Sequence, residues 1–157
     1  MKTLELLAKA SAILAGLLLI VVTLVICASL TGRNTTGWTV AGDYELIGVA
    51  AGAGIALFMP WGQLRRANIV VDFFTAGLKP ATHAVLDRVG AALLGLAIGI
   101  LAWRAAIGGW HAWQAGSATM MLALPEWIVY AVLVPPLALS TAIAFAQAAG
   151  AFPEQTP

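Results

Sequence analysis

The sequence predicts an all-α membrane protein with four transmembrane helices and a short amphipathic interfacial helix between the second and third spans. Of its 157 residues, 61% are hydrophobic and only 10% are charged, whereas soluble domains carry about 25% charged residues. Apolar stretches occur four times, and each is near the roughly 20 residues that cross a bilayer. Charged residues return between the second and third stretches, which marks the interfacial segment.

The first span is expected over residues 10–30. The uncharged run from Ala10 to Gly32 exceeds the about 7–15 apolar residues of a signal peptide, so we interpret it as a membrane helix. The stretch from Thr31 to Gly37 is rich in turn-forming residues and is expected to end this helix. Cys27 lies inside the apolar run and is expected to be a small packed residue.

The other three spans are expected over residues 44–64, 80–104 and 127–152, and together the four spans make one membrane domain. The third helix should begin at Pro80, because the fixed φ of proline suits a first helical turn. Pro135 and Pro136 should kink the fourth span, since neither residue has an amide donor.

The segment over residues 68–78 is expected to form the interfacial helix. At helical spacing its polar side chains make one stripe, and its apolar side chains cover the opposite side. Such a helix lies flat at the membrane surface. The stripe is Asn68, Asp72, Thr75 and Lys79, and the apolar side is Ile69, Val70, Phe73, Phe74 and Leu78. A loop that alternates by chance is the other interpretation.

Basic residues predict the orientation in the membrane, since they favour the cytoplasmic side. With four spans, both termini and the middle connection share one side, which holds six of the eight basic residues. Both termini are therefore expected in the cytoplasm. The six are Lys2, Lys9, Arg65, Arg66, Lys79 and Arg88; the other two are Arg33 and Arg104. All six tryptophans fall near expected span ends, as is typical of interface anchors.

Small residues recur every four positions in three of the spans. This spacing lets helix backbones approach closely in lipid, so it predicts a compact bundle or a face that docks another helix. The second span carries Gly48, Gly52 and Ala56, the third Ala91, Gly95 and Gly99, and the fourth Ala138, Ala142, Ala146 and Gly150.

Residues that carry chemistry are scarce. The only two histidines, His83 and His111, are 28 residues apart, roughly 42 Å along a helix, so they cannot share a haem within one chain. The sequence has no metal-ligand cluster, phosphate loop or cysteine pair. We therefore expect no enzyme, no cofactor and no metal site. The net charge of +1 argues against nucleic acid as a partner.

Several motifs resemble one transporter family. These are Gly42-Asp-Tyr-Glu-Leu46, Met59-Pro-Trp-Gly-Gln-Leu-Arg-Arg66, Asn68-Ile-Val-Val-Asp-Phe-Phe-Thr75, Leu86-Asp-Arg88, Ala102-Trp-Arg104, Thr119-Met120 and Leu124-Pro-Glu-Trp127. They are similar to the small membrane subunit, the DctQ-like family, of tripartite ATP-independent periplasmic (TRAP) transporters. The likeness runs from about residue 8 to residue 147. This chain departs from many family members at two places. Many members carry two acids at the start of the second span, where only Glu45 fits clearly here, and many carry Gly-His where this chain has Ala67-Asn68.

The resemblance implies a scaffold role in the bacterial inner membrane. The chain would assist a large membrane subunit, and a periplasmic binding protein would deliver an organic acid for sodium-driven symport. The transported solute is left open. Candidate subunit-contact residues are Glu45, Arg104, Arg65, Arg66, Asp72, Gly48, Gly52, Gly95 and Gly99. Two other functions stay open: the membrane anchor of a redox enzyme, and a stand-alone small transporter.

Overall fold

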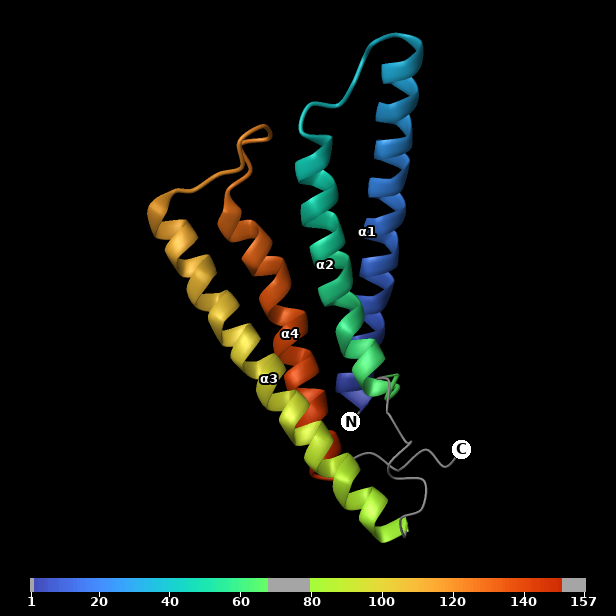
Figure 1. Cartoon of the computed structure of the whole chain (residues 1–157), viewed down its shortest axis with the longest axis vertical. Coiled ribbons are helices and arrows are strands. Elements are labelled where there is room, and N and C mark those ends of the chain that lie inside the picture. Colours follow the sequence, from blue (N-terminus) through green and yellow to red (C-terminus); the bar gives the residue numbers. More distant parts are fainter. Residues whose placement is uncertain (1, 68–79, 151–157) are drawn as a thin grey trace.

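The computed structural model describes residues 2–67 and 80–150, which form four helices (Figure 1). They are α1 (Lys2–Thr35), α2 (Asp43–Leu64), α3 (Pro80–Ala115) and α4 (Glu126–Ala148). Within these ranges there is no β-strand, and the predicted all-α fold is confirmed. Helix α3 begins at Pro80 as expected. The predicted interfacial helix at 68–78 lies outside the described residues.

All four helices are long and apolar enough to cross a membrane. Their large apolar side chains mostly point outward, as those of a lipid-exposed bundle do. The effect is strongest in α1, where only 11% of the most apolar window is buried. Lipid or another protein chain must therefore cover most of this helix.

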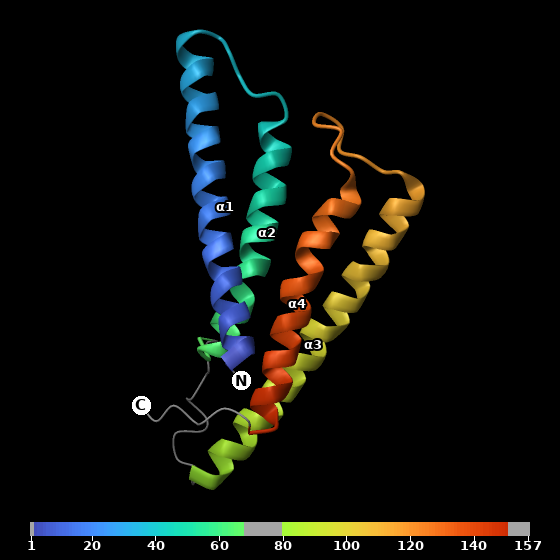
Figure 2. The same cartoon turned by 180° about the vertical axis from the view of Figure 1, so that it is seen from behind.

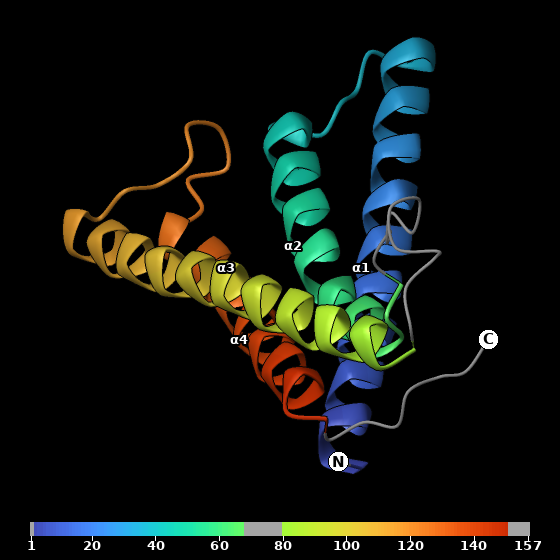
Figure 3. The same ribbon diagram turned by 60° about the horizontal axis from the view of Figure 1, so that its bottom comes forward.

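The helices form two antiparallel hairpins, α1 with α2 and α3 with α4 (Figures 1 and 2). Helices α2 and α4 join the hairpins, so the order across the molecule is α1, α2, α4, α3. Among the described helices, α3 packs only on α4, and it diverges from the first hairpin (Figure 3). We call the end with the two hairpin connections the loop end, and the end where α1 begins and α4 stops the terminal end.

Helix α1 extends past its expected end at residue 30. Thr31 and Thr35 were expected in a turn but are helical, and each hydroxyl donates to the carbonyl four residues earlier, at 2.8 Å. This bonding lets threonine stay inside a helix. The chain turns only at Gly37, whose φ of 75° suits glycine.

The expectation that Cys27 is packed inside was wrong, because its side chain is exposed. Helix α1 touches α2 along one side and α4 only slightly, so most of its circumference faces outward. An apolar run in a membrane helix predicts the span, but it does not predict which residues face protein.

Small side chains fill most of the contacts between helices. Ala50, Ala53 and Ala56 are buried in α2, and Ile143 and Ala144 are fully buried in α4. Gly54 of α2 is also buried, and a Cβ added there would lie 2.9 Å from Leu19 Cδ2 of α1. Close backbone approach of this kind replaces the hydrophobic driving force that is missing between helices in lipid.

Candidate subunit-contact site

A polar link between the two hairpins near the loop end is made by Glu45, in the first turn of α2. Its Oε1 accepts from the Met121 amide at 2.9 Å, and its Oε2 accepts from the Leu122 amide at 3.0 Å. Hydrogen bonds to a charged carboxylate are stronger than neutral ones. Glu45 therefore holds the α3–α4 connection against the start of α2.

The α3–α4 connection is itself ordered by hydrogen bonds. The Thr119 amide donates to the Leu124 carbonyl at 2.9 Å, and the Glu126 amide donates to the Ser117 carbonyl at 3.0 Å. At its tip, Met120 is fully exposed. The connection is thus a fixed loop that presents an apolar side chain at the surface.

Replacing Glu45 by glutamine should loosen this loop. The amide group keeps one acceptor but turns a donor toward a backbone amide, so one charge-assisted bond is lost. We expect hydrogen exchange at Met121 and Leu122 to quicken by about tenfold. Mass spectrometry of the deuterated chain measures it, with Glu5→Gln, an exposed acid at the start of α1, as the matched control. Unchanged exchange would show that the carboxylate does not hold the loop.

A second polar cluster ties α1 to the start of α2. The Arg33 guanidinium pairs with Asp43 at 3.0 Å, and the Ser29 hydroxyl donates to Asp43 Oδ2 at 3.3 Å. Ser29 is fully buried and also accepts from the Val40 amide at 3.2 Å. Sequence reasoning left Asp43 without a role. The sequence did hold a signal for the ion pair, because Asp43 and Arg33 have opposite charges and flank the short connection between the first two helices.

A third cluster joins the hairpins near the terminal end. The Gln63 side-chain amide donates to Gln147 Oε1 at 2.7 Å, and the Gln147 side-chain amide donates to the Gln63 carbonyl at 2.7 Å. Both side chains are buried. Sequence reasoning missed this pair, although two glutamines within apolar stretches were a signal for a contact between helices. Polar bonds therefore fix α2 to the second hairpin at both ends.

The candidate glycines of α3 lie inside the chain's own packing. A Cβ on Gly95 would lie 3.2 Å from Ala144 Cβ, and one on Gly99 would lie 3.2 Å from Thr141 Cγ2. Their small size thus serves the α3–α4 contact. Whether a partner also reaches them stays a prediction.

The candidate glycines of α2 lie differently. A Cβ on Gly48 or Gly52 would meet nothing within 4 Å. At helical spacing both share a face with Tyr44 and Ile55, which are 77% and 68% exposed. We call Tyr44, Gly48, Gly52 and Ile55 the open face of α2. It is a shallow, apolar strip that has no packing partner within the described chain.

The charged candidates are spread over the molecule. Arg65 follows α2 and stacks over the Trp61 ring, 4.7 Å from its centroid, and Arg66 adopts a φ of 51°. Asp72 lies outside the described residues.

Arg104 was expected at the end of a span, but α3 continues eleven residues beyond it to Ala115. Gly108 and Gly109 do not end this helix, and they seat Tyr130 of α4.

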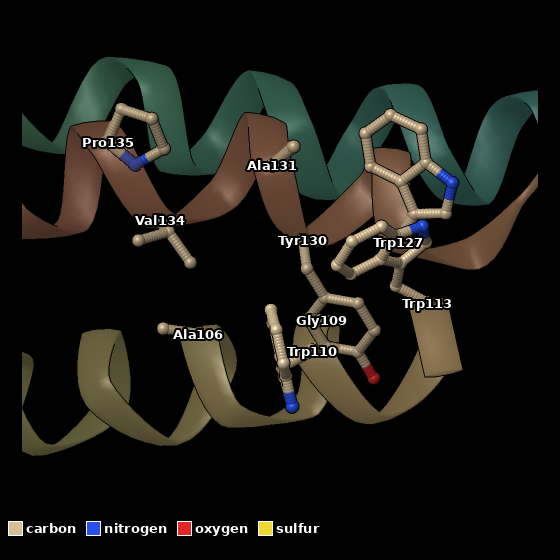
Figure 4. Close-up of a pocket in the computed structure, with 9 residues that line it drawn as sticks. All are labelled: Ala106, Gly109, Trp110, Trp113, Trp127, Tyr130, Ala131, Val134 and Pro135. Carbon is tan, nitrogen blue, oxygen red and sulfur yellow. The ribbon is translucent and has the colours of Figure 1, made fainter. Parts of the chain in front are cut away.

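An apolar groove of about 560 Å³ lies on one flank of the α3–α4 contact, near the loop end. Tyr130 reaches from α4 toward α3, and tryptophans from both helices surround the hollow (Figure 4). Trp110 and Trp113 meet edge to face, with centroids 5.2 Å apart. No charged residue lines this groove, so it suits an acyl chain or an apolar side chain rather than an organic acid.

These features define an integral membrane protein whose described polar contacts tie its helices together. Among the described residues, no group of three His, Cys, Asp or Glu side chains is placed to hold a metal. A family model described as "Tripartite ATP-independent periplasmic transporters, DctQ component" matches residues 22–154. The chain belongs to this family, and it is a small membrane subunit of a TRAP transporter, not a member of an enzyme family. No curated protein and no solved structure matched the chain.

Proposed function

We propose that this chain is a scaffold for the large membrane subunit in sodium-driven uptake of an organic acid. The large subunit carries the sodium and solute sites, and a periplasmic binding protein delivers the solute. The observation that carries this proposal is the contrast between a firmly tied bundle and an open face. Polar clusters fix α2 to the second hairpin at both ends, yet its Gly48–Gly52 strip has no partner within the described residues.

The open face of α2 is the proposed docking strip. Glycines four residues apart let a foreign helix backbone approach closely, and van der Waals packing drives such contacts in lipid. Tyr44 and Ile55 would flank the incoming helix. The strip begins one residue before Glu45, so the ordered α3–α4 loop lies beside it and would face the arriving binding protein.

The terminal end is proposed to face the cytoplasm. In the described residues it carries Lys2, Lys9, Arg65, Arg66 and Arg88, while Arg33 and Arg104 lie toward the loop end. Excess basic charge on one side favours that orientation. The loop end then faces the periplasm.

A solute site of the chain's own has little support. The acidic side chains of the described helices lie near helix ends, Arg104 lies exposed in the half of α3 nearer the loop end, and no helix is broken in its middle. Transport sites for ions and anionic solutes use such mid-membrane features. The redox alternative also lacks a site, because His83 and His111 are at opposite ends of α3.

Liposomes that contain only this chain test the proposal against a stand-alone transporter. We expect no solute uptake under a sodium gradient and no saturable binding of a dicarboxylate or sialic acid. The absorption spectrum of the purified chain should show no haem band. Saturable uptake by the chain alone would replace the scaffold function with a transporter function.

A further inference from the structure

The α3–α4 contact has a second hollow on its other flank, and this one is polar. It is a cleft of about 550 Å³ near the loop end, within the roughly 300–1,000 Å³ range of small-ligand pockets. Arg104, His111, Ser117, Glu126 and Tyr130 supply its polar side chains, and Ile107 with three small residues supplies its apolar part. Tyr130 lines both hollows and separates them.

The cleft's opposite charges do not neutralise each other. Arg104 and Glu126 both line it, but no ion pair within 4.0 Å joins them in the described part of the chain. An uncompensated cation on a membrane helix is costly, and such residues mark binding sites by default. The cleft therefore offers one cationic and one anionic group to a ligand.

The two charges lie at different depths. Tyr130 packs on Gly109, and Thr141 packs on Gly99, which places Glu126 near the level of Trp113 in the antiparallel pair. Glu126 is then about nine residues, or ~13 Å, nearer the loop end than Arg104. Helix α4 has 23 residues, ~35 Å, which is close to the hydrocarbon thickness, so its first residue lies near the membrane surface.

We propose that this cleft binds one zwitterionic phospholipid, with its phosphate at Arg104 and its ammonium group at Glu126. In any leaflet the phosphate lies nearer the acyl chains and the amine nearer water. That order matches Arg104 at depth and Glu126 at the surface. The phosphate and ammonium of one headgroup lie much closer together than ~13 Å, so the Arg104 side chain must extend toward the surface to meet the phosphate. The proposal needs only the membrane location of the helices, and it stands independently of the scaffold function.

Native mass spectrometry of the purified, delipidated full chain tests this. The probes are dioleoyl phosphatidylethanolamine, dioleoyl phosphatidylglycerol and dioleoylglycerol. We expect phosphatidylethanolamine to bind most tightly and dioleoylglycerol least. Arg104→Gln should weaken both phospholipids by about tenfold, because both lose a charge-assisted contact. Glu126→Gln should remove the preference for phosphatidylethanolamine and leave phosphatidylglycerol binding unchanged.

Two matched controls carry the same chemical changes at other exposed sites, Arg88→Gln and Glu5→Gln. Neither should alter lipid selectivity, and circular dichroism should show wild-type helicity in all four variants. Unchanged lipid binding in Arg104→Gln and Glu126→Gln would overturn the proposal. If those variants instead lower co-purification of the large subunit, the cleft receives a protein side chain. Displacement of the lipid by inorganic phosphate would mean that it takes a free anion.

Discussion

A leucine in place of Gly52 is expected to separate this chain from the large membrane subunit while leaving its own fold intact. A Cβ at Gly52 meets nothing within 4 Å inside the chain, so the leucine has room in the isolated subunit. On the docking strip the same side chain would push a packed helix away. Overpacking of a fitted contact costs about 1–3 kcal/mol, so the amount of complex should fall by about tenfold.

Co-purification of the large subunit with a tagged chain measures this effect, together with the thermal unfolding midpoint of the chain alone. Gly90→Leu is the matched control, because Gly90 is also a helical glycine with nothing within 4 Å but lies on α3. The control should retain the partner. Full retention by Gly52→Leu would show that the partner docks on a face other than the open face of α2.

Gly109→Leu is expected to damage the fold of the chain itself, because it separates the two helices of the second hairpin. A Cβ at this position would lie 2.7 Å from Tyr130 Cβ and 3.3 Å from Tyr130 Cγ. These atoms sit next to the backbone of α4 and cannot swing aside. Because α3 packs only on α4 among the described helices, a wider spacing there weakens all of its packing. We expect a loss of about 3 kcal/mol in unfolding free energy.

Denaturation of the isolated chain in detergent micelles measures the loss. Gly90→Leu again serves as the control, since it makes the same change on the same helix without a neighbour. Adding Tyr130→Gly to Gly109→Leu should restore part of the stability, because it removes both Tyr130 atoms, Cβ and Cγ, that the leucine meets. A wild-type unfolding midpoint for Gly109→Leu would contradict the packing described here.

Sequence periodicity predicted the number and order of the helices, because a bilayer demands long apolar runs. It predicted the end of α2 at residue 64, but not the ends of α1 and α3. Thr31 to Thr35 looked like a turn, but the hydroxyls bond back to the helix. The third helix was expected to end at residue 104, but α3 continues through Gly108 and Gly109, which receive Tyr130. The threonine bonds are local, but composition alone does not choose them over a turn. The Tyr130 contact joins two helices, so local composition does not contain it.

The small-residue pattern predicted packing faces but not their partners. Gly95 and Gly48 both belong to small-residue repeats of four, yet a Cβ at the first would meet Ala144 and one at the second would meet nothing within 4 Å. Only the arrangement of the helices separates internal contacts from open surface. Glu45 is similar: its position was found from the sequence, but its bonds to Met121 and Leu122 span 76 and 77 residues. No local pattern reports such a pairing.

The most direct test of the scaffold function is uptake by a reconstituted transporter with and without this chain. Proteoliposomes would hold the large subunit under an inward sodium gradient, with the solute-loaded binding protein outside. We expect rapid uptake when the chain is present and loss of uptake when it is left out. Equal sodium-driven uptake without the chain would contradict the scaffold function.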